Sequence, residues 1–219
     1  MIELILKVAL SYLEGSIVGS LLLGKLRGGV DIRKMASGNA GATNALRTQG
    51  KAFAFGVLFI DIFKGWVATR VIAPLTLFGG GGDAAGAGGA LAWAAALCGI
   101  ACMFGHVYPV FYGFRGGKGV ATLVGVVLGL GPALLVPVLA TWLVTAMLFG
   151  YVGLASMVAT LALPVAVVVG HVEPEMPMLV LGVCATALII YTHRSNIARM
   201  RAGTESRARR LWLFGKQRL

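Results

Sequence analysis

The sequence predicts an all-α integral membrane protein with about seven transmembrane helices. Only 12% of its 219 residues are charged and 58% are hydrophobic, too little charge to cover the surface of a soluble domain of this length. The mean hydropathy is +0.87, and apolar runs long enough to cross a bilayer recur along the chain. Because no polar stretch is long enough to fold separately, we expect a single polytopic membrane domain covering residues 1–219.

The chain before residue 120 and after residue 170 divides readily into apolar spans and polar connections. The first span is expected at Leu4–Leu26 and the second from Ala52 to about Phe78. Residues 79–89 are rich in glycine and nearly uncharged, which predicts a flexible external linker. The third span is expected at Ala90–Phe111, and the last at Met178–Thr192.

Charged residues orient these spans. Basic residues gather in residues 26–51 and again from residue 194 onward, whereas residues 79–89 and 171–177 carry only acidic charges. Cytoplasmic loops are enriched in Lys and Arg, so we expect an external N-terminus and a basic cytoplasmic tail at 194–219. Each basic residue beside an anionic leaflet is worth about 1 kcal/mol. The net charge of +11 therefore predicts membrane lipids as a partner, and not nucleic acid.

The apolar stretch 120–170 must start inside and end outside, so it crosses the membrane an odd number of times. Three crossings of about 16–17 residues just fit. The stretch is interrupted at Gly131-Pro132, Pro137, Gly150 and Pro164. The total is then seven spans. The alternative is five spans with re-entrant segments.

Several polar groups fall at membrane depth. Asp61 and Lys64 stand three residues apart on one helix and are expected to form a structural ion pair. Cys98, Cys102 and His106 share one helical face, but no fourth ligand is nearby, so no metal site is predicted. The three cysteines give no disulfide framework.

The first of three polar clusters lies between the first two spans. Small residues there would let backbone amides converge on an anion, while hydroxyls, carboxamides and a guanidinium complete the set of donors. No acidic residue interrupts the cluster. We expect it to bind an anion through Ser37, Gly38, Asn39, Thr43, Asn44 and Arg47.

The second cluster runs from Arg115 to Thr122. It is not a P-loop, because Tyr112 stands where the motif requires its first glycine and Gly119 stands where it requires Ser or Thr. Glycines and a lysine that open a helix nevertheless suit a phosphate, through unpaired amides and the helix dipole. The expected phosphate ligands are Gly116, Gly117, Lys118 and Gly119, with a hydroxyl from Thr122.

The third cluster lies at the cytoplasmic end of the last span. His193 and Asn196 are three residues apart and would face the same way on a helix. Arg194 and Arg199 disfavour protonation of the imidazole, which leaves a neutral ring able to accept a proton.

Together these clusters resemble the bacterial acyl-phosphate:glycerol-3-phosphate acyltransferase family of the PlsY type. Three departures are Val18, Ala36 and Ser195, where the family often has other residues. The matching residues are Gly15-Ser16-Ile17, Asp31-Ile32-Arg33, Ser37-Gly38-Asn39, Gly41-Ala42-Thr43-Asn44, Asp61, Lys64-Gly65, Gly105-His106, Pro109, Gly116-Gly117-Lys118-Gly119-Val120-Ala121-Thr122, His193, Asn196-Ile197, Arg199, Gly203 and Glu205.

The resemblance implies seven helices in the bacterial inner membrane, with the active site near the cytoplasmic face. It implies transfer of a fatty acyl group from acyl phosphate to the 1-hydroxyl of glycerol 3-phosphate, giving lysophosphatidate and phosphate. No cofactor or metal is implied. The sequence makes no prediction about the oligomeric state.

The resemblance also suggests roles for individual residues. Arg47, Lys118 and His193 would recognise charge, and Asn196 and the polar residues of the first cluster would orient the substrates. Ser156 resembles a family position near the site. An activated donor permits direct transfer without an acyl-enzyme, with His193 or a substrate phosphate as the base.

The main alternative function is a small transporter of a phosphorylated anion. A conducting path would need polar residues across the whole bilayer, and the outer half of the spans has almost none.

Overall fold

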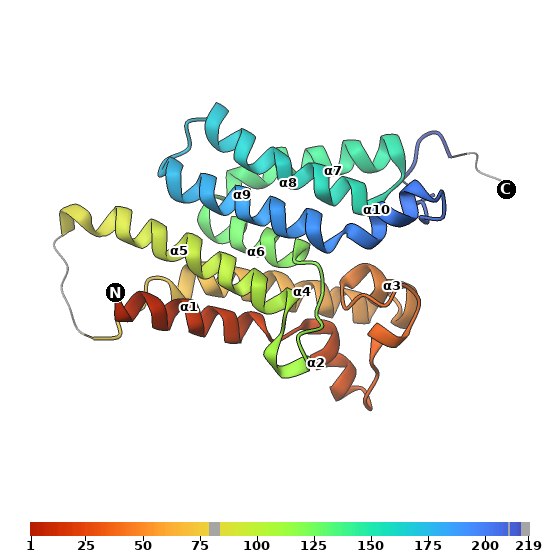
Figure 1. Ribbon diagram of the computed structural model, residues 1–219, viewed down its shortest axis with the longest axis horizontal. Coiled ribbons are helices and arrows are strands. Elements are labelled where there is room, and N and C mark those ends of the chain that lie inside the picture. Colours follow the sequence, from red (N-terminus) through yellow and green to blue (C-terminus); the bar gives the residue numbers. More distant parts are fainter. Residues whose placement is uncertain (79–83, 210, 216–219) are drawn as a thin grey trace. The chain divides into compact units, whose positions relative to one another are not determined.

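The computed structural model describes residues 1–78, 84–209 and 211–215 (Figure 1). Within these residues the chain is helical and contains no strand, which confirms the all-α prediction. The helices form two compact units, Met1–Gly131 and Pro132–Leu219. The grouping of the whole chain into a single membrane domain stays a prediction.

Unit 1 contains the first two polar clusters. Its elements are α1 (Ile2–Gly15), α2 (Gly19–Leu26), η1 (Ile32–Lys34), α3 (Ala42–Gln49), α4 (Lys51–Val67), the π-helical η2 (Ala68–Ile72), α5 (Ala84–Val107), η3 (Val110–Tyr112) and α6 (Val120–Leu130). Positive φ angles at Gly50 and Gly119 mark the starts of α4 and α6. Glycine adopts such angles without steric cost, so the chain can turn sharply before each helix.

The expected span Leu4–Leu26 is not a straight helix, because α1 and α2 meet at a 50° bend; that the pair forms one crossing stays a prediction. Apolar surroundings offer no water to the backbone groups freed at such a bend. Two side chains of α4 supply partners instead. The Lys64 ammonium donates to the carbonyls of Gly15 (2.8 Å) and Ile17 (3.0 Å), and Asp61 Oδ1 accepts from the Gly19 amide (3.1 Å).

The expected linker at residues 79–89 is wrong for its second half. Residues 79–83 lie outside the described residues, whereas residues 84–89 form the beginning of α5. Alanine has the highest helix propensity, and a helix satisfies its own backbone in an apolar environment. The third span, expected at Ala90–Phe111, agrees well with the apolar helical segment Gly88–Tyr112.

Glycines allow two helix pairs of unit 1 to pack closely. A Cβ at Gly15 would overlap the Cys102 carbonyl, and one at Gly105 would overlap the Tyr12 carbonyl, so α1 and α5 approach backbone to backbone. Gly65 and Gly125 serve α4 and α6 in the same way. Small residues at helix contacts are what close packing in a membrane requires.

Unit 2 is built on three long helices, of which α8 packs against both others. Gly182 of α9 lies against Pro164 of α8, where a larger residue would be crowded. The elements are η4 (Pro132–Leu134), α7 (Leu135–Phe149), α8 (Val152–Val169), α9 (Glu175–Thr192) and α10 (Arg194–Arg201).

Described residues beyond α10 fold back onto the turn between α7 and α8. The Ala208 amide donates to the Gly150 carbonyl (2.7 Å), and the Leu213 amide donates to the Met147 carbonyl (3.0 Å). Carbonyls at a helix C-terminus lack helical partners, so these bonds cap α7. The Arg207 guanidinium stacks on Tyr151 and Trp212 and fixes the segment.

Among the described residues, five helices are long and apolar enough to cross a membrane, and six if the bent pair α1–α2 counts as one span. The five are Lys51–Ile72, Gly88–Tyr112, Pro132–Phe149, Val152–Val169 and Glu175–Thr192. The stretch 120–170 contains three apolar helices, α6, α7 and α8, of which α6 is short. Seven crossings and the sides on which the termini lie stay predictions.

Candidate active site

Asn44 organises the first polar cluster from inside. Its side chain is buried, and Nδ2 lies 2.8–3.1 Å from the carbonyls of Ile32, Met35 and Asn39. Oδ1 accepts from the Ser37 amide at 3.2 Å. The carboxamide is therefore occupied by backbone, and the prediction that Asn44 binds substrate directly is corrected: it shapes the loop. Ser37, Gly38, Thr43 and Arg47 are exposed around it, and Asn39 is half-buried.

We expect Asn44→Ala to lower the free energy of unfolding by about 2–3 kcal/mol, because buried carbonyls and an amide lose their partners. Thermal unfolding in detergent would measure this. Gln49→Ala is the matched control, since it removes a carboxamide from the same helix whose bond to Met35 is exposed. Equal losses from the two substitutions would contradict the role assigned to Asn44.

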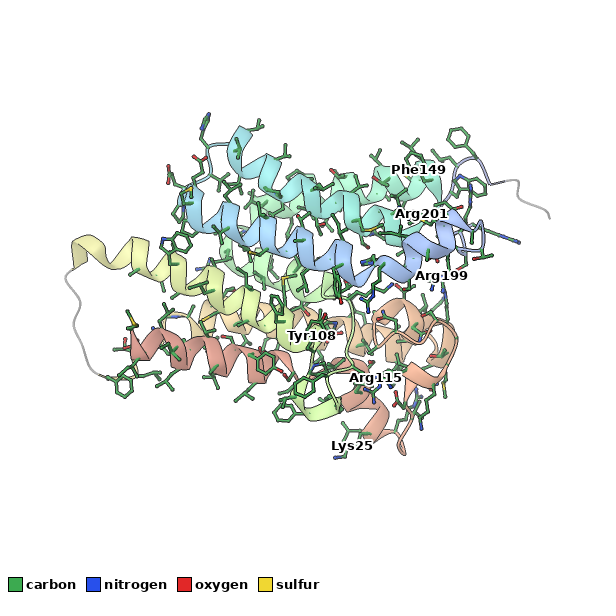
Figure 2. The ribbon with its side chains drawn as sticks, viewed as in Figure 1. Lys25, Tyr108, Arg115, Phe149, Arg199 and Arg201 are labelled. Atoms are coloured by element: carbon green, nitrogen blue, oxygen red, sulfur yellow. The ribbon has the colours of Figure 1, made fainter. Side chains whose placement is uncertain are left out.

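Arg33 joins the first cluster to the loop that precedes the second. Its guanidinium pairs with the Asp31 carboxylate (2.9 Å), and Nη1 donates to the carbonyls of Tyr112 (2.9 Å) and Arg115 (2.8 Å). Hydrogen bonds from Arg33 hold the pKa of the Asp31 carboxyl below its usual range. Arg115 lies among the loops of unit 1 (Figure 2). No local pattern in the sequence indicates this contact, because about 80 residues separate its two sides.

The glycines of the second cluster divide into two kinds. The amides of Gly116 and Gly117 donate to the carbonyls of Val107 and His106, so they cap α5. Their predicted role as phosphate donors is therefore corrected. A Cβ at either position would overlap His106. Gly119 differs, because its φ of +87° starts α6 and leaves the first-turn amides of that helix without helical acceptors.

Lys118 and Thr122 stand on either side of this helix start. Lys118 is half-buried. Thr122 is fully buried in the first turn of α6, and its hydroxyl has no hydrogen-bond partner among the described residues. A buried hydroxyl without a partner is unfavourable. The predicted role of Thr122 toward a substrate stays a prediction.

The ion pair expected between Asp61 and Lys64 is confirmed, with Nζ 3.3 Å from Oδ1. Sequence reasoning missed the third member: His106 Nδ1 lies 2.9 Å from Lys64 Nζ and 3.4 Å from Asp61 Oδ1. All three side chains are buried. His106, on α5, thus contacts the charged pair of α4. Its spacing from Cys98 and Cys102 does not reflect a shared site.

Unit 2 contains the third cluster. His193 is buried, and its Nδ1 lies 2.8 Å from the Ile189 carbonyl. A carbonyl only accepts, so Nδ1 carries a proton; when the ring is neutral, the lone pair is on Nε2. Proton acceptance requires this tautomer. Asn196 Nδ2 donates to Glu205 Oε1 (2.6 Å), and Glu205 also pairs with Arg199 (2.6 Å).

Ser156 lies one turn beyond Gly153, the residue against which Asn196 packs. Its hydroxyl donates to the Val152 carbonyl (2.9 Å) and accepts from Trp142 Nε1 (3.3 Å). Its role in the site stays a prediction. The structure therefore brings the first two clusters together in unit 1, and His193, Asn196 and Ser156 together in unit 2.

Comparisons with known proteins show the family of the chain. The family model described as glycerol-3-phosphate acyltransferase matches residues 5–203. The chain belongs to the glycerol-3-phosphate acyltransferase family. A member from Bordetella petrii is 42% identical over 91% of both chains, and one from Chlorobium limicola is 35% identical over 99% of both.

A solved structure places the chain in the PlsY type of this family. The crystal structure of PlsY, an integral membrane glycerol 3-phosphate acyltransferase, in its glycerol 3-phosphate form has a TM-score of 0.80 and 36% identity, covering 93% of this chain and 94% of that one. Its lysophosphatidic acid form has a TM-score of 0.78. The chain is accordingly a multi-pass integral membrane protein.

Proposed function

We propose that this acyltransferase moves a fatty acyl group from acyl phosphate to the 1-hydroxyl of glycerol 3-phosphate, giving lysophosphatidate and inorganic phosphate. The observation that supports the proposal is the Arg33 contact, which joins the segment just before Ser37 to the loop just before Lys118. Two phosphate-bearing substrates need two neighbouring groups of donors. The PlsY forms with glycerol 3-phosphate and lysophosphatidic acid support this acceptor and product.

The donor follows from the chemistry of the site. Acyl phosphate is a mixed anhydride with a good leaving group, so positioning and charge neutralisation supply most of what the reaction needs. The acceptor hydroxyl oxygen attacks the acyl carbonyl carbon, and the bond from that carbon to the phosphate oxygen breaks. Phosphate leaves with the bonding electrons. The hydroxyl proton passes to His193 Nε2 or to a substrate phosphate.

In unit 1, Arg47 and Lys118 neutralise phosphate charge, and Ser37, Asn39 and Thr43 orient the substrates. The first-turn amides after Gly119 hold one phosphate, with the Thr122 hydroxyl close by in sequence. Gly38 keeps the loop open for this approach. In unit 2, the roles of His193, Asn196 and Ser156 rest on the family resemblance.

Direct transfer is favoured over an acyl-enzyme. A covalent route needs a nucleophile hydrogen-bonded to a base. The Ser156 hydroxyl donates to a backbone carbonyl, and the Cys102 thiol, although it donates to a Glu14 oxygen (3.3 Å), is fully buried where α1 and α5 pack closely. We place the reaction at the cytoplasmic face of the bacterial inner membrane, because the basic clusters follow the positive-inside pattern.

Purified protein would test this function when supplied with glycerol 3-phosphate and either a long-chain acyl phosphate or the matching acyl-CoA. We expect lysophosphatidate and phosphate in equal amounts, and only from acyl phosphate. Product formed only from acyl-CoA would overturn the donor. Flux of glycerol 3-phosphate into vesicles without product would instead identify a transporter.

A further inference from the structure

The tautomer of His106 is fixed by its neighbours. Lys64 Nζ lies 2.9 Å from His106 Nδ1, and the same ammonium donates to the carbonyls of Gly15 and Ile17. An ammonium only donates, and the Asp61 carboxylate is the more distant neighbour of Nδ1 (3.4 Å), so we assign Nδ1 as the acceptor. The proton of the neutral imidazole therefore sits on Nε2, opposite to the arrangement in His193.

The Nε2–H group faces the glycine loop. A Cβ at Gly117 would overlap Nε2, and the Gly117 amide is bonded to the His106 carbonyl. His106 is only 2% exposed, yet within the described parts of the chain Nε2 has no hydrogen-bond partner. This donor lies beside the residue that precedes Lys118, just before the start of α6.

A buried hydroxyl without a hydrogen-bond partner among the described residues, that of Thr122, follows in the first turn of α6. His106 lies at the end of α5 and Thr122 in the first turn of α6, so the two donors flank the loop that leads to a helix start suited to an anion. A phosphate oxygen can accept from each of them, and neither donor has a protein acceptor to exchange for it. This pattern indicates a ligand that is itself an acceptor.

We propose that His106 is a phosphate-binding residue, which donates Nε2–H to the phosphate group held at the start of α6. Lys64 donates to Nδ1 and so fixes the proton on Nε2, on the side of the ring that faces the loop. The ammonium also polarises the ring, which makes Nε2–H a stronger donor to the anion. Asp61 balances the ammonium when the site is empty. The assignment rests on the proposed function, because it adds one more binding residue, His106, to the phosphate site proposed there.

Two substitutions separate the nitrogens of His106. Asparagine is short, so His106→Asn keeps an acceptor near Lys64 and removes the donor to the loop. Glutamine reaches further, so His106→Gln keeps a donor near the loop and loses the contact with Lys64. The probe is inorganic phosphate, and the measurements are its effect on the unfolding temperature in detergent and the KM and kcat of acyl transfer.

We expect phosphate to stabilise the wild type and His106→Gln, but to stabilise His106→Asn much less. His106→Gln should unfold at a lower temperature without phosphate, whereas His106→Asn should unfold near the wild type. The KM for the phosphate-bearing substrates should rise about tenfold in His106→Asn, with a smaller change in kcat, as for loss of one charge-assisted hydrogen bond.

The opposite pattern overturns the assignment: an unchanged KM and an unchanged phosphate effect in His106→Asn would make the residue purely structural. If both variants fail to fold, histidine-selective isotope labelling of the wild type decides, because phosphate must then shift the ring signals of His106. Stabilisation by phosphate needs no turnover. Binding without acyl transfer would therefore reject the proposed function and keep this site.

Discussion

Lys118→Met is expected to lower kcat/KM for acyl transfer by about 10²–10³-fold, the usual cost of removing one donor that stabilises developing charge. The ammonium is the only cation within the loop 116–119. The amides of Gly116 and Gly117 are bonded to α5, so the loop relies more heavily on Lys118 than its four-residue motif suggests. Steady-state rates with both substrates varied would measure the loss.

Lys25→Met is the matched control for this substitution. Lys25 is an exposed lysine on α2 of the same unit (Figure 2), so its removal changes net charge equally without touching the loop. Its kcat/KM should stay within about twofold of the wild type. Near-normal turnover of Lys118→Met at saturating substrate, with an unchanged unfolding temperature, would show that the glycine loop does not bind the reacting phosphate.

The polar clusters could be located from the sequence. Whether each side chain in them bonds to the backbone or faces a ligand could not. Periodicity and charge place Asn44 in an anion-binding loop, and the structure turns its carboxamide inward onto three carbonyls. A carboxamide suits a backbone and a ligand equally well. The choice depends on where the preceding loop runs, which residue types alone do not determine.

Contacts between distant segments explain the other differences. Gly116 and Gly117 resemble phosphate-binding glycines, but they are required because His106 leaves no room for a Cβ. The bend after Gly15 was equally hidden, because an apolar run of suitable length predicts a straight span. Its partners, Asp61 and Lys64, lie more than 40 residues away.

Those two residues give the second large prediction. Lys64→Met is expected to lower the free energy of unfolding by about 3–5 kcal/mol, the range for breaking a buried ion pair by removing one partner. It leaves the buried Asp61 carboxylate without its cation and the carbonyls of Gly15 and Ile17 without their donor. Denaturation by a strong detergent, with the folded fraction followed by size-exclusion chromatography, would measure the loss.

Lys7→Met is the control, because it breaks the Lys7–Glu3 pair (2.7 Å) at the start of α1, where the carboxylate is partly exposed. A pair of that kind contributes about 1 kcal/mol or less. Equal losses from Lys7→Met and Lys64→Met would mean that the buried pair does not hold the bend.

Combining Asp61→Asn with Lys64→Met separates the contribution of charge from that of hydrogen bonding. The double variant contains no buried charge at this position, so it should be more stable than the sum of the two single losses predicts. It should still fall below the wild type, because methionine cannot donate to the carbonyls at the end of α1. Full recovery would assign the whole effect to the unpaired charge, and strict additivity would show that the two side chains support α1 and α2 independently.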